Sequence, residues 1–97
     1  MQYNFEWDPR KASNNSRKHG ITFEEAVAVF KDPMALSLYE VDESDSKEDR
    51  WVTLGLIDGQ HYLVVVHTYQ ASKYSTTIRI ISARRATRQE IKQYEQG

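Results

Sequence analysis

The chain has 97 residues, enough to form one compact hydrophobic core, and its 39% apolar and 11% aromatic residues exclude a disordered tail. The absence of cysteine excludes disulfides and thiolate metal sites, and the net charge of −1 argues against nucleic-acid binding through overall charge. We therefore expect residues 1–97 to form a single domain that needs no metal or cofactor.

No segment has the pattern of a targeting or membrane-spanning element. The first residues lack the basic region and apolar stretch of a signal peptide. The longest apolar runs, residues 26–30 and 62–66, are far too short to cross a bilayer. These features predict a soluble cytoplasmic protein that does not bind membranes.

The first third of the chain predicts one strand and two helices. Residues 3–7 alternate between apolar and polar side chains, which is the period of a half-buried strand. Residues 9–19 follow an Asp-Pro start and precede Gly20, so they predict a helix that ends at this glycine. Residues 22–30 open with a capping box and continue with apolar residues at helical spacing, which predicts a second helix.

The remainder of the chain predicts four strands and a last helix. Runs rich in β-branched and aromatic residues occupy residues 34–41, 50–57, 61–69 and 76–83. A second capping box, Thr87 to Glu90, opens a helix that continues to Tyr94. The order β-α-α-β-β-β-β-α with short connections predicts an α+β fold, in which helices pack on an antiparallel β-sheet.

Charged residues are unevenly distributed along the sequence. Residues 40–49 contain six acids and one base, whereas residues 79–92 contain five bases and one acid. Within the basic segment, Arg84, Arg85 and Arg88 either contact RNA or form an ordinary solvated edge. Charge alone leaves both interpretations open.

No strong local catalytic motif is present, so any catalytic site has to be assembled from separate elements. The sequence lacks a glycine-rich phosphate loop, a histidine pair with metal-ligand spacing and a nucleophile elbow. RNA cleavage without a metal requires a base for the 2′-hydroxyl, an acid for the leaving oxygen and fixed cations around the phosphate. Arginine suits the last role because it stays charged and grips two phosphate oxygens.

Two arginines on predicted strands are candidates for holding a phosphate. Strict alternation places Arg79 on one face with Ile81 and Ala83, and it places Arg50 on one face with Val52. Each has an alternative role. Instead of binding a phosphate, Arg79 could pair with a carboxylate on the sheet. For Arg50, spacing alone favours an ion pair with an acid of the preceding segment over a catalytic role.

Other candidates supply a proton, a stacking ring or further positive charge. His67 and Tyr69 project from the same face of one predicted strand, and Lys11 and Lys18 share one stripe of the first helix. Each also has a structural alternative. His67 could be a hydrogen-bonded histidine within the sheet, Tyr69 an aromatic residue of the core or its rim, and Lys18 a residue that contacts the last carbonyls of its helix.

Three segments of the chain resemble the BrnT toxin family. They are FEWDPRKA followed by KHGITFEEA in residues 5–26, EDRW through Gly55 in residues 48–55, and IRIISARRAT in residues 78–87. The resemblance covers nearly the whole chain in order. It implies a RelE-like fold and a ribonuclease toxin of a type II toxin–antitoxin system that inhibits translation.

The resemblance also implies partners. RNA is the expected substrate, and a BrnA-type ribbon-helix-helix antitoxin is the expected protein partner, with operator DNA bound only through the antitoxin. The alternative is a non-catalytic member that binds its antitoxin and acts as a co-repressor of its operon.

The suspected active-site residues of the family correspond here to Lys18, Arg50, Arg79 and Arg84, with His67 and Tyr69 nearby. We expect Arg79 and Arg50 to hold the scissile phosphate, and Lys18 and Arg84 to hold neighbouring phosphates or to polarise the 2′-oxygen. Further RNA contacts are expected from Lys11, Arg85 and Arg88. The chain departs from many relatives in having Asp45-Ser46 where they carry a His-Ser pair, which puts a role for that histidine in doubt.

Overall fold

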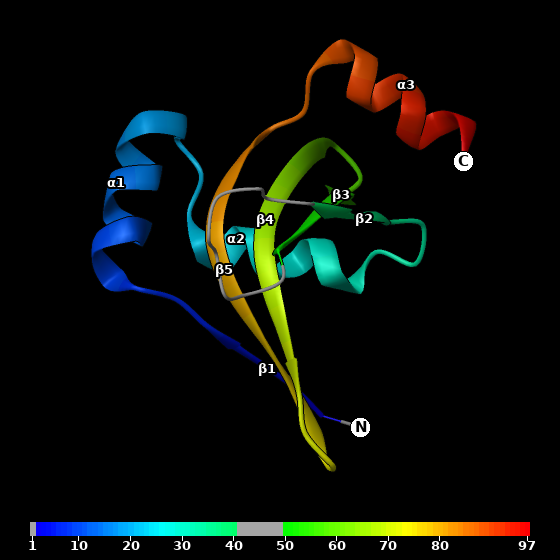
Figure 1. Ribbon diagram of the computed structural model, residues 1–97. Coiled ribbons are helices and arrows are strands. Elements are labelled where there is room, and N and C mark those ends of the chain that lie inside the picture. Colours follow the sequence, from blue (N-terminus) through cyan, green and yellow to red (C-terminus); the bar gives the residue numbers. More distant parts are fainter. Residues whose placement is uncertain (1, 41–49) are drawn as a thin grey trace.

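A computed structural model describes residues 2–40 and 50–97. The elements are β1 (Gln2–Glu6), α1 (Pro9–His19), α2 (Phe23–Val27), the 3₁₀ helix η1 (Ala28–Lys31), β2 (Leu36–Glu40), β3 (Arg50–Ile57), β4 (His61–Ala71), β5 (Ser75–Arg85) and α3 (Arg88–Gln96) (Figure 1). This order confirms the predicted α+β fold. The acidic segment and its Asp45-Ser46 pair lie outside the described residues.

The five strands form one sheet in the order β1-β5-β4-β3-β2. Strands β2 to β5 pair antiparallel, as predicted, but β1 pairs parallel to β5. The sheet is therefore mixed, which corrects the expectation of an antiparallel sheet. A parallel pair requires a long connection, and the whole chain between β1 and β5 provides one.

The helices begin and end at residues with suitable capping chemistry. The side chain of Asp8 accepts a hydrogen bond from the backbone N–H of Arg10 at 2.8 Å, and Gly20 ends α1 in the left-handed conformation with φ 70°. Thr22 and Glu25 form the predicted capping box of α2. The helix predicted to reach residue 30 is α-helical only to Val27 and then continues as η1.

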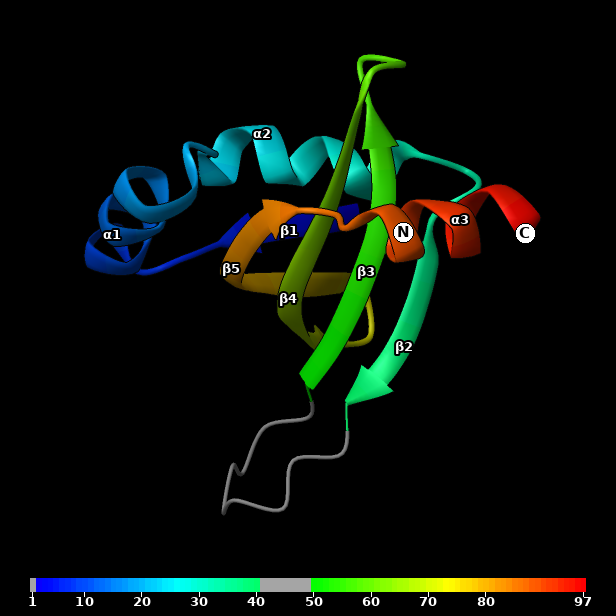
Figure 2. The ribbon, with the colours of Figure 1, turned by 90° about the horizontal axis from the view of Figure 1, so that it is seen from above.

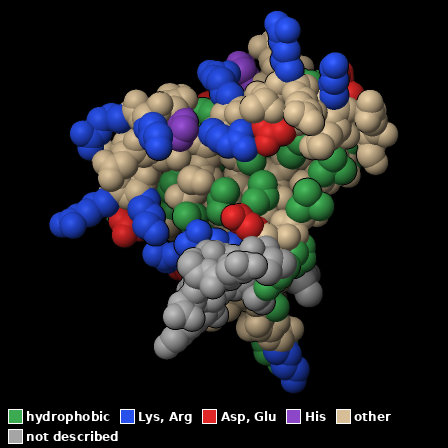
Figure 3. All heavy atoms as spheres, turned by 45° about the horizontal axis from the view of Figure 1, so that its top comes forward, with side chains coloured by type: hydrophobic (Ala, Val, Ile, Leu, Met, Phe, Trp, Pro, Cys, Tyr) green, Lys and Arg blue, Asp and Glu red, His purple; other side chains and the backbone are tan. Residues whose placement is uncertain are grey.

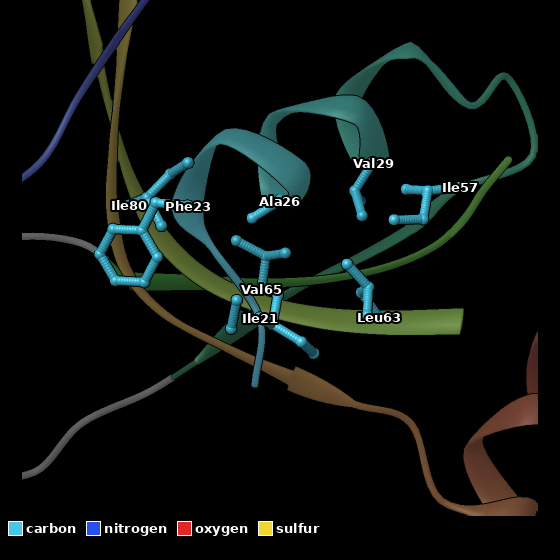
Figure 4. Close-up of a cluster of buried hydrophobic side chains, with 9 residues drawn as sticks. Ile21, Phe23, Ala26, Val29, Ile57, Leu63, Val65 and Ile80 are labelled. Atoms are coloured by element: carbon cyan, nitrogen blue, oxygen red, sulfur yellow. The ribbon is translucent and has the colours of Figure 1, made fainter. Parts of the chain in front are cut away.

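The main core lies between one face of the sheet and the layer formed by α2 and η1 (Figure 2). Its buried side chains are Ile21, Phe23, Ala26, Val29, Ile57, Leu63, Val65, Ile80 and Ala83 (Figure 4). Gly55 of β3 lets η1 approach closely, because a Cβ at this position would lie 2.7 Å from Cγ1 of Val29. We call this side of the sheet the helix face.

Helix α1 has little apolar surface and is fixed to β5 by one buried amide. Nδ2 of Asn15 donates to the carbonyl oxygens of Ala83 at 2.8 Å and Ile21 at 3.2 Å, and its Oδ1 accepts from the backbone N–H of Ala83 at 3.0 Å. The pairing of β1 with β5 ends at Arg79. Farther along this edge of β5, the Asn15 side chain makes the hydrogen bonds with the backbone of Ala83 that a neighbouring strand would make.

Helix α3 lies against the opposite side of the sheet, which we call the open face. The hydroxyl of Tyr94 donates to Asp32 at 2.7 Å, and the rings of Tyr94 and Tyr62 lie 5.3 Å apart. Beneath the helix, Leu54 and Val64 are buried. Helix α3 therefore covers only one part of the open face that the described residues form. Among the described residues, no helix combines the length and apolar character needed to span a membrane.

Candidate active site

Arg50 and Arg79 lie on the open face, one on each side of Thr68. Arg50 of β3 pairs with Thr68 of β4, and Thr68 pairs with Arg79 of β5. Cross-strand partners project from the same face of a sheet. We call these three residues the arginine row. Two carboxylates flank it in the same register, Glu40 beside Arg50 and Glu6 beside Arg79.

The spacing of the arginine row suits one phosphate group. Its two arginines are separated by two interstrand steps, about 10 Å between Cα atoms. Arginine side chains are long enough to converge over Thr68 from both sides, and each guanidinium presents several donors in a planar fork. The side chain between them is the small hydroxyl-bearing Thr68, which is largely buried.

The ion pair of Arg79 is loose. Its Nη1 lies 3.6 Å from Oε1 of Glu6, and the two side chains are 39% and 50% exposed. Exposed pairs of this kind contribute about 0–1 kcal/mol. The carboxylate partner considered for Arg79 from the sequence therefore exists, but it holds the guanidinium too weakly to exclude a phosphate.

A β-bulge brings Arg84 to the same face as Arg79. The register of β4 and β5 shifts at Val66/His67, so that Val66 pairs with Ser82 whereas His67 pairs with Ile80. Strict alternation, which places Arg79 with Ala83, is therefore wrong: Ala83 is part of the core on the helix face.

Beyond the bulge, Arg84 lies on the open face and Arg85 on the helix face. Arg84 pairs in register with Val64, which α3 covers, whereas Arg85 pairs with Leu63 of the core. Arg85 also lines a small hollow that includes Glu25. Adjacent residues of a strand project to opposite faces, and the bulge decides that Arg84 rather than Arg85 shares the open face with Arg79.

Arg84 is held by a two-point ion pair with the first turn of α3. Its Nη1 and Nη2 atoms each lie 2.9 Å from an oxygen of Glu90. The hydrogen bonds from Arg84 lower the pKa of Glu90 to about 2. This pair fixes the position of Arg84, but it also occupies part of the guanidinium that a phosphate would bind.

The lysines of α1 lie along the edge of β5. Lys11 and Lys18 are one turn before and after Asn15, so they share the stripe of the helix that contacts Ala83. Both side chains are exposed. Lys18 therefore lies near the end of β5 that carries Arg84. Arg88 is exposed at the first position of α3.

His67 and Tyr69 are on the helix face, so the structure does not bring them to the arginine row. The imidazole of His67 is fully buried, and its Nε2 lies 2.6 Å from Oγ1 of Thr53. The rings of Phe30 and Tyr69 are 4.7 and 4.9 Å from it. Burial lowers the pKa of His67 to about 4 and raises the pKa of Tyr69.

An aromatic hollow of about 270 Å³ is also found on the helix face. It is lined by Tyr3, Phe5, Phe30, Lys31, Tyr69 and Ile78. No member of the arginine row lines it. The hollow is thus separated from the candidate phosphate site by the thickness of the sheet.

On the part of the open face that α3 does not cover, positive charge of the described residues lies next to apolar surface. Figure 3 views the side of the molecule that carries α3, where Lys and Arg side chains lie above and to the left of an area of hydrophobic side chains. Within residues 2–40 and 50–97, no three His, Asp or Glu side chains gather as potential metal ligands.

Sequence reasoning missed two members of this surface. Glu6 lies within the FEWDP segment, but its pairing with Arg79 depends on the parallel contact of β1 with β5. Thr68 follows His67 in the strand predicted over residues 61–69, and only the register places it between two arginines. The sequence contained one signal for the position of Glu6: alternation along the strand puts it on the face opposite the apolar Phe5.

Comparisons with known proteins identify the family and the fold of this chain. The family described as ribonuclease toxin BrnT of type II toxin–antitoxin systems matches residues 7–90. The crystal structure of the Brucella abortus ribonuclease toxin BrnT is similar with a TM-score of 0.61 and 20% identity, covering 91% of this chain and 100% of that chain, which shows a shared fold. No curated protein sequence matches the chain. The chain belongs to the BrnT family of ribonuclease toxins.

Proposed function

We propose that the protein is a metal-independent endoribonuclease that inhibits translation by cleaving RNA through its own 2′-hydroxyl. The family supports ribonuclease activity in general. The observation that carries the specific proposal is the arginine row, in which Arg50 and Arg79 flank Thr68 on one face of the sheet. Two guanidinium groups supply the positive charge that a metal ion supplies in other nucleases.

In this mechanism, Arg50 and Arg79 bind the non-bridging oxygens of the scissile phosphate. Negative charge accumulates on these oxygens as the 2′-oxygen attacks, so the fixed guanidinium groups stabilise the transition state more than the bound substrate. Arg84 and Lys18 extend the cationic surface towards a neighbouring phosphate, with Lys11 and Arg88 at its margins. His67, Tyr69 and Arg85 are left out of the site because they lie on the helix face.

The partner that we propose is a BrnA-type antitoxin with a ribbon-helix-helix DNA-binding part. Membership of a type II toxin–antitoxin family implies a protein antitoxin. The open face carries exposed apolar and basic side chains around the arginine row, including Leu38 at 71% exposure. An antitoxin bound there would block RNA access, and it would connect the toxin to operator DNA.

The experiment compares purified wild-type protein with Arg79→Ala and Arg50→Ala on single-stranded RNA, on its 2′-deoxy counterpart and on translating ribosomes. We expect cleavage in EDTA on free RNA, products with 2′,3′-cyclic phosphate ends, and no cleavage of the deoxy strand. Each arginine variant should lose about 10²–10³ in rate.

Arg17→Ala is the matched control, because Arg17 is exposed and its guanidinium contacts Ser13 and Asn14 of its own helix. It should cleave at the wild-type rate. A folded Arg79→Ala variant that cleaves as fast as the wild type would overturn the proposed site. A wild-type protein that binds its antitoxin but cleaves no RNA would favour the non-catalytic co-repressor instead.

A further inference from the structure

We propose that the carboxylate of Glu6 is the general base that removes the proton from the attacking 2′-hydroxyl. This inference rests on the proposed ribonuclease function and assigns the proton acceptor that the arginine row lacks. The guanidinium groups of the row donate hydrogen bonds and cannot accept a proton. A separate acceptor within reach of the phosphate is therefore required.

Glu6 lies at the end of the arginine row, close enough to Arg79 for its carboxylate to be near a phosphate that Arg79 binds. Oε1 of Glu6 lies 3.6 Å from Nη1 of Arg79, and its side chain is half exposed. A phosphate oxygen bound to the same guanidinium would lie about 3 Å from its nitrogen. Arg79 thus holds the phosphate and the carboxylate side by side, which brings the carboxylate next to the ribose of the scissile linkage.

The other titratable groups near this surface are less suitable. Both oxygens of Glu90 accept hydrogen bonds from Arg84, and its pKa of about 2 makes it a poor base. His67 is fully buried on the helix face. Glu40 flanks the row beside Arg50 in a mirrored position, so it is the rival that an experiment has to separate from Glu6.

The proposed step is balanced in protons and electrons. The 2′-hydroxyl proton moves to a Glu6 oxygen while the O2′–P bond forms. The P–O5′ bond breaks, its electron pair stays on the 5′-oxygen, and that oxygen takes a proton from water. The products are a 2′,3′-cyclic phosphate and a 5′-hydroxyl, and Glu6 returns its proton to solvent.

The test measures single-turnover cleavage of a short RNA by Glu6→Gln as a function of pH. Glutamine keeps the size of the side chain and can still accept a hydrogen bond from Arg79, but it cannot take a proton at these pH values. We expect a rate loss of about 10²–10⁴ and disappearance of the acidic limb of the pH–rate profile, with little change in KM. Glu6→Asp should retain the limb at a reduced rate.

Glu24→Gln is the control, because it removes the same charge from an exposed position on α2. If Glu6 only positions Arg79, Glu6→Gln will keep the wild-type limb, and the base assignment is then wrong even though Arg79→Ala remains inactive. Loss of the limb in Glu40→Gln instead would place the base at the other end of the row. A wild-type protein without RNA cleavage would overturn both this inference and the proposed function.

Discussion

Asn15 and Ala83 form a two-way hydrogen-bonded pair, in which one side-chain amide satisfies both the N–H and the C=O of a strand residue. The amide imitates the backbone of a neighbouring strand at the edge of β5. Because α1 has no buried apolar side chain of its own, this pair is its main fixed point on the sheet. The position of Lys18 relative to the end of β5 depends on it.

Asn15→Ala should destabilise the protein by about 1–3 kcal/mol, since two buried backbone groups of Ala83 lose their partner. Asn15→Asp should be worse than alanine, because a carboxylate has no donor for the carbonyls of Ala83 and Ile21. Urea unfolding followed by circular dichroism measures both variants. Asn14→Ala, at an exposed position, should change the free energy of unfolding by less than about 0.5 kcal/mol.

His67 should make the protein less stable as the pH falls from about 6.5 to about 4. The pKa of His67 in the folded state, about 4, lies below the ordinary histidine value of 6.5, so the unfolded chain binds the proton first. The free energy of unfolding should fall with a contribution of up to about 1.4 kcal/mol per pH unit in this window. His67→Gln should remove this contribution between pH 6.5 and 5, whereas His61→Gln, at an exposed position, should retain it.

The Arg84–Glu90 pair should stabilise the protein above about pH 4.5 and lose its effect as the pH falls towards 2. The pKa of Glu90 is lowered from 4.5 to about 2, so protonation in the unfolded state precedes protonation in the folded state. Glu90→Gln should therefore be less stable than the wild type at pH 6. The difference between their unfolding midpoints should shrink steadily between pH 4.5 and 2. An unchanged difference across this range would contradict the pairing.

Gly55→Ala should destabilise the protein by about 1–3 kcal/mol, because the new methyl group would overlap Cγ1 of Val29. Val29→Ala removes that methyl group and should relieve part of the overlap. A double-mutant cycle measured by urea unfolding should then give a coupling energy of about 0.5–3 kcal/mol. Strictly additive effects would show that η1 does not contact β3 at this point.

The sequence was sufficient for the elements themselves. The ends of α1 and the start of α2 follow from Asp8, Gly20 and Thr22, because capping is local chemistry between residues a few positions apart. The bounds of β3 were also predicted correctly from local sequence. A run of residues typical of strands lies between a charged segment and a turn.

The sequence was insufficient where the structure depends on contacts between distant residues. Alternation predicts a strand over residues 3–7, close to the observed β1 (Gln2–Glu6), but it does not show that β1 pairs with β5 or in which direction. The bulge between Ile80 and Ser82 leaves no local pattern, although it decides that Arg84 rather than Arg85 shares a face with Arg79. Cross-strand register, which creates the arginine row, is a property of the folded sheet.

Strand β1 occupies an edge of the sheet and has β5 as its one neighbour. During synthesis, β1 leaves the ribosome first and remains without its partner until residue 79 has been added. The groups proposed to deprotonate the 2′-hydroxyl and to hold the phosphate therefore come together late, and a prematurely terminated polypeptide that lacks β5 contains no Arg79 to pair with Glu6. Under the proposed mechanism, aborted translation products of this toxin have no means of harming the cell that makes them.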